Sequence, residues 1–145
     1  VMLQTATIVY SRSRSLSTVL IRGADRWGRF SHCGVVTPND TIIEARLFGG
    51  VVETPHDQFN ARVSHQELVH VPVFDLDSGL EWLSSQRGKG YDVLAILGNL
   101  VRESWQNEDR WQCAELVETF LTKCGRPRFR PDAWRISPTQ SWSVL

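Results

Sequence analysis

The stretch that decides the fold is NEDRWQCAELVETFLTKCG, residues 107–125. From Cys113 onward, apolar residues recur at steps of three and four, which predicts an amphipathic helix that packs one face on a core. Asn107 and Asp109 are suitable N-cap residues, and Gly125 stands where a left-handed residue ends a helix. The pattern therefore places Cys113 in or near the first helical turn.

A thiol in that position is close to the positive end of the helix dipole and to unpaired backbone N–H groups. Both lower its pKa from the free value of about 8.5 and favour the nucleophilic thiolate. The alternative is that Cys113 is a small buried hydrophobe, because it shares the apolar stripe with Leu116 and Val117. A base elsewhere in the chain would favour the nucleophile.

Composition indicates one ordinary globular domain over residues 1–145, with 41% hydrophobic and 22% charged residues. Lys plus Arg equals Asp plus Glu at 16 each, so no net charge recruits nucleic acid. No apolar run is long enough for an integral membrane segment, and no signal peptide is recognisable. We expect a soluble protein, cytoplasmic as given or exported without such a signal, and the sequence leaves its oligomeric state open.

The predicted elements follow the order strand, helix, several strands, then helices. Strands are expected at 3–10, 31–36, 41–46, 51–53 and 67–74, and helical pieces at 18–22, 76–86, 93–101 and 138–142, with a short helical or irregular piece at 55–62. Pro72 assigns the last strand to an edge or a strand end. This order predicts an α+β fold with a small antiparallel sheet or barrel packed against helices.

The two strands at 31–36 and 41–46 are joined by the turn sequence TPND and form a predicted antiparallel hairpin. A four-residue turn pairs His32 with a residue near 45, so that Glu44 becomes its cross-strand or diagonal neighbour. A carboxylate that accepts the imidazole N–H fixes the tautomer and stabilises the imidazolium. Gly34 beside them indicates close approach of another backbone or a ligand. The competing interpretation is an ordinary surface His–Glu pair.

The other histidines, His56, His65 and His70, lie in polar segments and are expected at the surface. Three cysteines without a CxxC pair argue against a disulfide framework or a cysteine zinc site. Cys33 alternates with His32 along the strand, so it faces the other way and is predicted to be core, as is Cys124. For the same reason the adjacent His32 and Cys33 cannot easily share a metal ion, and we expect neither metal nor cofactor.

Five short motifs occur in a familiar order: SHCGVV at 31–36, IIEA at 42–45, GVVETP at 50–55, GKGYD at 88–92 and WQCAELV at 111–117. Over residues 20–121 the chain resembles the circularly permuted branch of the NlpC-type papain-fold cysteine peptidases and amidases, the YiiX/YebB-like group. In that group the histidine precedes the cysteine along the chain. Departures are Cys33 where an apolar residue is commoner, Gln112 where an aromatic is usual, and Ala114 where serine is frequent.

The resemblance implies a papain-like fold and a cysteine hydrolase that acts through an acyl-enzyme. It assigns Cys113 as the nucleophile, His32 as the base and Glu44 as the residue that orients the base. It matches Tyr91 to a tyrosine that polarises the carbonyl or binds its oxyanion; a packing role for Tyr91 stays open. The implied substrates are peptidoglycan stem peptides or N-acyl amides.

The loop before His32 carries large and basic side chains that are candidates for one wall of the cleft. Trp27 and Arg29, together with Trp111 near the nucleophile, are the predicted substrate-binding residues. Arginine at this place suits a substrate that bears a carboxylate.

Two other kinds of protein remain compatible with the sequence. One is a non-catalytic binding or structural module that retains the fold, such as a phage-tail or secretion-associated component. The other is a lecithin retinol acyltransferase-like acyl transferase, which has the same site and a lipid acceptor. A membrane-anchoring apolar segment would favour that transferase, and the sequence has none.

Overall fold

The computed structural model describes residues 2–12, 29–46, 49–91, 110–111, 113–129 and 136–144. The predicted helices at 18–22 and 93–101 lie outside the described residues. The predicted N-cap residues Asn107 and Asp109 lie outside them as well.

The described elements reproduce most of the expected order. The strands are β1 (Gln4–Arg12), β2 (His32–Val36), β3 (Thr41–Arg46), β4 (Gly50–Pro55), β5 (His65–Val73), β6 (Gly90–Tyr91) and β7 (Arg110–Trp111). The helices are α2 (His56–Arg62), α3 (Leu76–Ser85), α5 (Cys113–Lys123) and α6 (Pro138–Ser143).

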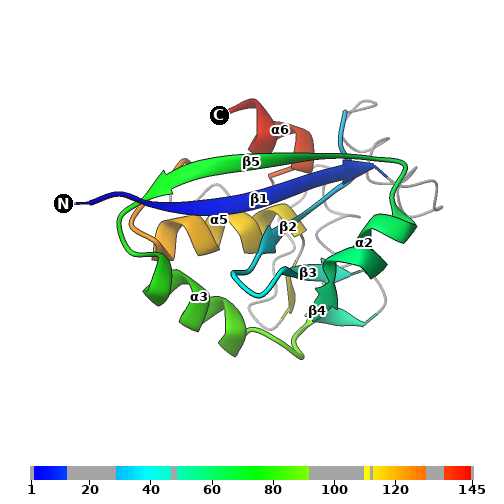
Figure 1. The fold of residues 1–145 in the computed structure, drawn as a ribbon, viewed down its shortest axis with the longest axis horizontal. Helices are drawn as coiled ribbons and strands as arrows, with labels where there is room; N and C mark the ends of the chain where they lie inside the picture. Colours follow the sequence, from blue (N-terminus) through cyan, green and yellow to red (C-terminus); the bar gives the residue numbers. More distant parts are fainter. Residues whose placement is uncertain are drawn as a thin grey trace.

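One antiparallel sheet of five strands organises the molecule, in the order β4-β3-β2-β1-β5. β1 is paired on both sides, whereas β5 lies at one edge and β4 at the other. The position of β5 agrees with the prediction from Pro72, which pairs with Thr5 close to the end of the strand. Figure 1 shows α3 and α5 together on one side of the strands and α2 near β4.

The face of the sheet toward α5 carries the main apolar core. Alternate residues of each strand point to it, as the two-residue period of a strand requires. The strands contribute Ala6, Ile8, Tyr10, Cys33, Val35, Ile43, Ala45, Val51, Val71 and Val73. From α5, the side chains of Leu116, Val117, Phe120 and Leu121 are buried against them, which confirms the amphipathic stripe.

The opposite face is covered more sparsely. Phe59 of α2 packs on Val9 and Ile42 in a small separate cluster. Because α2 has only seven residues, it covers the end of the sheet near β3 and β4 and leaves room there for polar side chains.

The end of α5 follows the expected cap. Gly125 has a φ of 78°, and the amide of Arg126 donates to the carbonyl of Leu121 at 2.8 Å. The carbonyl of Cys124 accepts the amides of Phe74 (3.0 Å) and Asp75 (3.1 Å), which fixes the end of α5 to the start of α3.

A short parallel pair brings the segment before α5 to the sheet. Tyr91 of β6 pairs with Trp111 of β7, and Lys89, just before β6, accepts the amide of Val51 in β4 at 2.8 Å. Through this pairing β6 contacts β4 and β3, β7 contacts β4, and α5, which begins at Cys113, contacts β3.

The α+β class and the antiparallel sheet packed against helices are therefore confirmed, and the sheet is open rather than a barrel. The helix ending near Trp142 begins with Pro138 at its first turn, as predicted, and Ser137 caps it with a capping box. Among the helices that the structure describes, none has the length and apolar character needed to cross a membrane.

Candidate active site

The β2–β3 hairpin sets the first two site residues side by side. The amide of Asp40 donates to the carbonyl of Thr37, and Asp40 takes a left-handed φ of 57°. The register places Gly34 opposite Glu44, so His32 is the diagonal neighbour of Glu44 on the same face of the sheet. The prediction from the turn sequence is confirmed in this respect.

Gly34 provides the space for this diagonal contact. A Cβ at Gly34 would lie 2.8 Å from Cγ2 of Ile42 and 3.3 Å from Cβ of Glu44. A side chain at this position would therefore occupy the region through which His32 and Glu44 approach one another. Nε2 of His32 lies 2.5 Å from Oε2 of Glu44.

Glu44 is fully buried and has three hydrogen-bond partners. Besides His32, its carboxylate accepts from Oγ1 of Thr54 at 2.8 Å and from Nη2 of Arg62 at 2.5 Å. Burial raises the pKa of Glu44, but the hydrogen bond and charge of His32, with Thr54 and Arg62, outweigh it and lower the pKa to about 2. Glu44 is thus an anion that can stabilise a positive imidazole.

His32 interacts with groups on two sides. Its ring stacks on Phe59, with ring centroids 6.2 Å apart, and 18% of its side chain is exposed. Burial lowers its pKa, yet hydrogen bonds and charges of Cys113 and Glu44 raise the pKa to about 10. Since Glu44 takes Nε2, Nδ1 is the nitrogen left for the thiol of Cys113.

Cys113 is the first residue of α5 and is 2% exposed. A hydrogen bond from Cys33 lowers the pKa of Cys113 and, together with the hydrogen bond and charge of His32, outweighs the effect of burial. Burial and the neighbouring Cys113 raise the pKa of Cys33 well above its usual value. The two opposite shifts favour the thiolate form at Cys113 and the protonated form at Cys33.

The structure thus brings together three of the predicted site residues: Cys113, His32 and Glu44. In this order the thiolate can attack a carbonyl carbon and the imidazolium can transfer a proton, while the carboxylate orients the imidazolium. Among the described residues, no group of three or more His, Cys, Asp or Glu side chains is arranged to hold a metal ion.

The structure describes the other predicted site residues only in part. Trp27 lies outside the described residues, and Tyr91 and Trp111 are described in their backbone only. Arg29 binds Glu67 at 2.5 Å, and its guanidinium lies 4.7 Å from the ring centroid of Trp142. In this arrangement Arg29 connects the loop before β2 to β5 and α6.

Three partners of the site were not identified in the sequence. Thr54 and Arg62 hold Glu44, but a threonine in a strand and an arginine at a helix end have no local signature for this role. Cys33 is buried, as predicted, and the register places it opposite Tyr10 on the face toward α5. Its contact with Cys113 depends on the packing of α5 against β2.

The expectation for the other histidines needs one correction. His65 and His70 are exposed, as predicted. His56 instead has only 16% of its side chain exposed, because its Nδ1 forms a hydrogen bond of 2.6 Å with Asp40, which lies in the β2–β3 turn. A hydrogen bond between segments that are distant along the chain produces this difference.

A second buried polar network lies on the α5 side of the sheet. Glu118 accepts from Nη2 of Arg128 at 2.5 Å and from Oγ of Ser141 at 2.5 Å. The hydroxyl of Tyr10 lies 2.8 Å from Ser141 and accepts from Arg128 at 3.1 Å. Burial is the main cause that raises the pKa of Tyr10 to about 12, so this hydroxyl remains protonated.

The fold and the cluster define an α+β protein in which a helix that starts with cysteine packs on an antiparallel sheet carrying histidine and glutamate. Among solved structures, the chain is similar to YiiX from Escherichia coli O157:H7, described as a metalloprotein, DUF1105. The TM-score is 0.62 at 23% identity, over 88% of this chain and 69% of that chain. No protein-family model and no curated protein matches the sequence. The likeness to YiiX therefore concerns the fold.

Proposed function

We propose that this chain is a cysteine-dependent amide hydrolase with a papain-like fold of the permuted NlpC type, and that residues 1–145 form one such domain. Cys113 is the nucleophile, His32 the general base and Glu44 the residue that orients it. The observation that carries the proposal is the position of His32, whose ring interacts with Glu44 on one side and with Cys113 on the other.

The charge state of the three groups supports this assignment. The lowered pKa of Cys113 and the raised pKa of His32 correspond to a thiolate–imidazolium pair near neutral pH. The buried Glu44 stabilises the imidazolium and fixes the orientation of its ring. An ordinary surface His–Glu pair would not be buried, nor would it be held by Thr54 and Arg62.

The proposed reaction has two steps. The thiolate of Cys113 forms a bond to the amide carbonyl carbon, and the carbonyl oxygen becomes an oxyanion that backbone N–H groups stabilise. His32 gives its proton to the amide nitrogen, the C–N bond breaks and the amine leaves. Water then attacks the thioester while His32 takes its proton; the S–C bond breaks and the thiolate returns.

We assign the oxyanion side of the proposed site to the β6–β7 pair. Tyr91 pairs with Trp111, two residues before Cys113, which supports roles for Tyr91 near the oxyanion and for Trp111 near the substrate. Trp27 and Arg29 complete the proposed substrate wall. Small peptides, cell-wall stem peptides and acyl amides are the substrates that this chemistry accommodates.

A metal-dependent function is the second candidate, because the similar structure of YiiX is described as a metalloprotein. The described residues of this chain do not fit such a centre: Nε2 of His32 binds Glu44, and the raised pKa of Cys33 keeps its thiol protonated. A metal analysis of the purified protein, together with activity assays before and after treatment with a chelator, separates the two candidates.

The test of the proposal compares the three cysteines of the chain. Iodoacetamide is reacted with wild-type protein over a range of pH, and labelled sites are located by mass spectrometry. We expect labelling of Cys113 at a rate that stays high well below pH 8. Cys124, whose pKa is raised to about 12 by burial, is the matched control and should stay unlabelled.

Activity is then measured on purified peptidoglycan and on N-acyl amides. Cys113→Ala should abolish hydrolysis, whereas Cys124→Ala should retain it. Equal, slow labelling of all cysteines together with no hydrolysis by the wild type would indicate a non-catalytic module with this fold. Hydrolysis unaffected by Cys113→Ala would contradict the assignment of Cys113 as the nucleophile. Transfer of the acyl group to a lipid acceptor instead of water would indicate an acyl transferase.

A further inference from the structure

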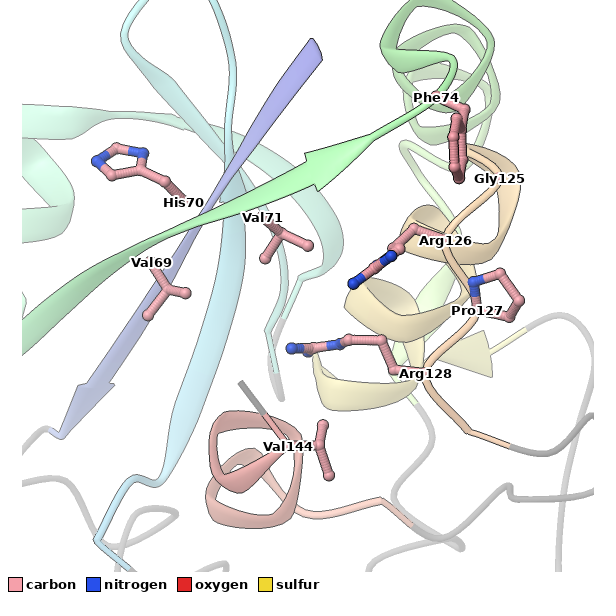
Figure 2. A pocket seen from close by; sticks show the side chains of 9 residues that line it. All are labelled: Val69, His70, Val71, Phe74, Gly125, Arg126, Pro127, Arg128 and Val144. Atoms are coloured by element: carbon pink, nitrogen blue, oxygen red, sulfur yellow. The ribbon is translucent and has the colours of Figure 1, made fainter. Parts of the chain in front are cut away.

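A pocket opens at the free edge of β5, away from the His32–Glu44 pair. It lies between β5, the segment that follows α5 and the end of α6 (Figure 2), and its cavity volume is about 450 Å³. Ligand sites in proteins commonly have volumes of roughly 300–1,000 Å³, so this pocket is large enough for a small molecule. No acidic side chain lines it among the described residues.

Arg128 forms the inner wall of the pocket and has an unsatisfied donor. Its side chain is 8% exposed, and Nε and Nη2 donate to Glu118 at 3.1 and 2.5 Å. Nη1 is buried and has no hydrogen-bond partner in the described part of the chain. An unpaired buried guanidinium N–H is costly, and an oxyanion in the pocket would supply the missing acceptor.

Arg126 adds a second positive charge at the mouth. The segment from Gly125 to Arg128 is irregular, and Figure 2 shows the guanidinium groups of Arg126 and Arg128 directed to the same side, toward β5. Arg126 is exposed and takes part in none of the ion pairs of the described residues. Because Glu118 balances Arg128, the net positive charge of the pocket comes from Arg126.

Apart from His70, the other side chains that line the pocket are apolar. Val69 and Val71 of β5 line the pocket together with Phe74 and Val144. Phe74 is 52% exposed and Val144 is 43% exposed, so large apolar surfaces face water at the mouth. Burying them under a hydrocarbon chain is favourable at about 25 cal/mol per Å².

We propose that this pocket binds a small amphiphilic acid. Its oxyanion, a carboxylate or a phosphate ester, binds Arg126 and Arg128, and its short apolar chain lies against Phe74 and Val144. The proposal does not depend on hydrolysis at Cys113, because none of the lining residues belongs to that site.

Isothermal titration calorimetry with the full chain tests the chemistry of the ligand. The probes are octanoate and octyl phosphate, with octanol and octylammonium as controls of equal chain length. We expect binding of at least one acid and none of either control; the tighter acid identifies the preferred headgroup. Equal binding of octanol, or binding of neither acid, would overturn the proposal.

Variants test the location. Arg126 is exposed, and Arg126→Gln should weaken binding of the acid about tenfold. Arg87 pairs with Glu53 of β4, at the edge of the sheet opposite β5, and Arg87→Gln should leave the binding unchanged. The side-chain nitrogen resonances of Arg128 should shift in NMR spectra as the acid is added. Unchanged affinity in Arg126→Gln, or unchanged Arg128 resonances at saturation, would place any binding elsewhere and overturn the proposal.

Discussion

Two buried carboxylates, Glu44 and Glu118, are held by the same kinds of groups and have different surroundings. Each accepts from an arginine and from a hydroxyl: Glu44 from Arg62 and Thr54, Glu118 from Arg128 and Ser141. The difference is the next partner along the network. This comparison suggests how one structural unit can support either chemistry or stability.

Beside Glu44 stands an imidazole, which gains and loses a proton and which interacts with a thiol. The network of Glu118 continues through Ser141 and Arg128 to Tyr10, whose pKa of about 12 keeps its proton in place at neutral pH. Arg62 is partly exposed, at 35% of its side chain, whereas Arg128 is nearly buried at 8%. We therefore expect Glu44 to matter for reactivity and Glu118 to matter for folding.

The largest expected effect is on activity, and it rests on the proposed function. Glu44→Gln should lower kcat for the amide substrate about 10³-fold, or about 4 kcal/mol, because His32 loses the anion that orients and charges it. Glu118→Gln should leave kcat close to the wild-type value. Steady-state kinetics on folded protein checks both, and equal losses in the two variants would remove the distinction between the carboxylates.

The next largest effect is on stability, and here Glu118→Gln should have the larger effect and Glu44→Gln the smaller one. Glu118→Gln should lower the free energy of unfolding by about 3–4 kcal/mol, because it leaves the buried Arg128 without its counter-charge. Glu44→Gln should cost about 1–2 kcal/mol, since Arg62 is partly exposed and can turn to water. Urea unfolding measures both values. A larger loss in Glu44→Gln would contradict the assignment.

The His32–Glu44 pair should also make stability depend on pH. Glu44, with its pKa lowered to about 2, contributes stability above its unfolded pKa of 4.5 that is lost as the pH falls toward 2. His32, with its pKa raised to about 10, contributes stability below 6.5 that is lost as the pH rises through 10. The pair therefore contributes fully between about pH 4.5 and 6.5.

Thermal unfolding measured from about pH 2 to about pH 10 should show a loss of stability in the wild type as the pH falls from about 4.5 toward 2. Glu44→Gln should reduce the loss of stability at acid pH, and His32→Asn should reduce the loss of stability at alkaline pH. Identical pH profiles for the wild type and Glu44→Gln would show that the pair does not titrate in this way.

The smallest expected effects come from the two hydroxyl donors. Thr54→Val keeps the shape of the side chain and removes one hydrogen bond to Glu44, and Ser141→Ala does the same for Glu118. Each should cost about 1 kcal/mol of stability, and only Thr54→Val should also reduce activity, by a few fold. A matching loss of activity in Ser141→Ala would link the two networks.

Much of the fold follows from local patterns. The apolar steps after Cys113 predicted α5, and the TPND turn predicted the hairpin that sets Glu44 diagonal to His32. Gly125 and Pro138 marked a helix end and a helix start where the structure has them. These signals are local because hydrogen bonds and turn geometry act over a few residues.

The surroundings of the site did not follow from such patterns. Arg62 approaches Glu44 from a helix that packs across the sheet, and Cys33 contacts Cys113 because α5 lies on β2. Arg128 reaches Glu118 only after the chain has turned at Gly125. In each case the partners belong to different elements, so their spacing in the sequence gives no sign of the contact.

The sequence by itself determined most of the described helices and strands and the pairing of His32 with Glu44, because strand register and helix periodicity depend on residues that are close together in the chain. Only the tertiary structure decided which charges are buried and what neutralises them. Burial depends on the packing of whole helices on the sheet, and burial is what shifts a pKa and makes an unpaired donor costly. The lowered pKa of Cys113 and the unpaired donor of Arg128 both arise from that packing.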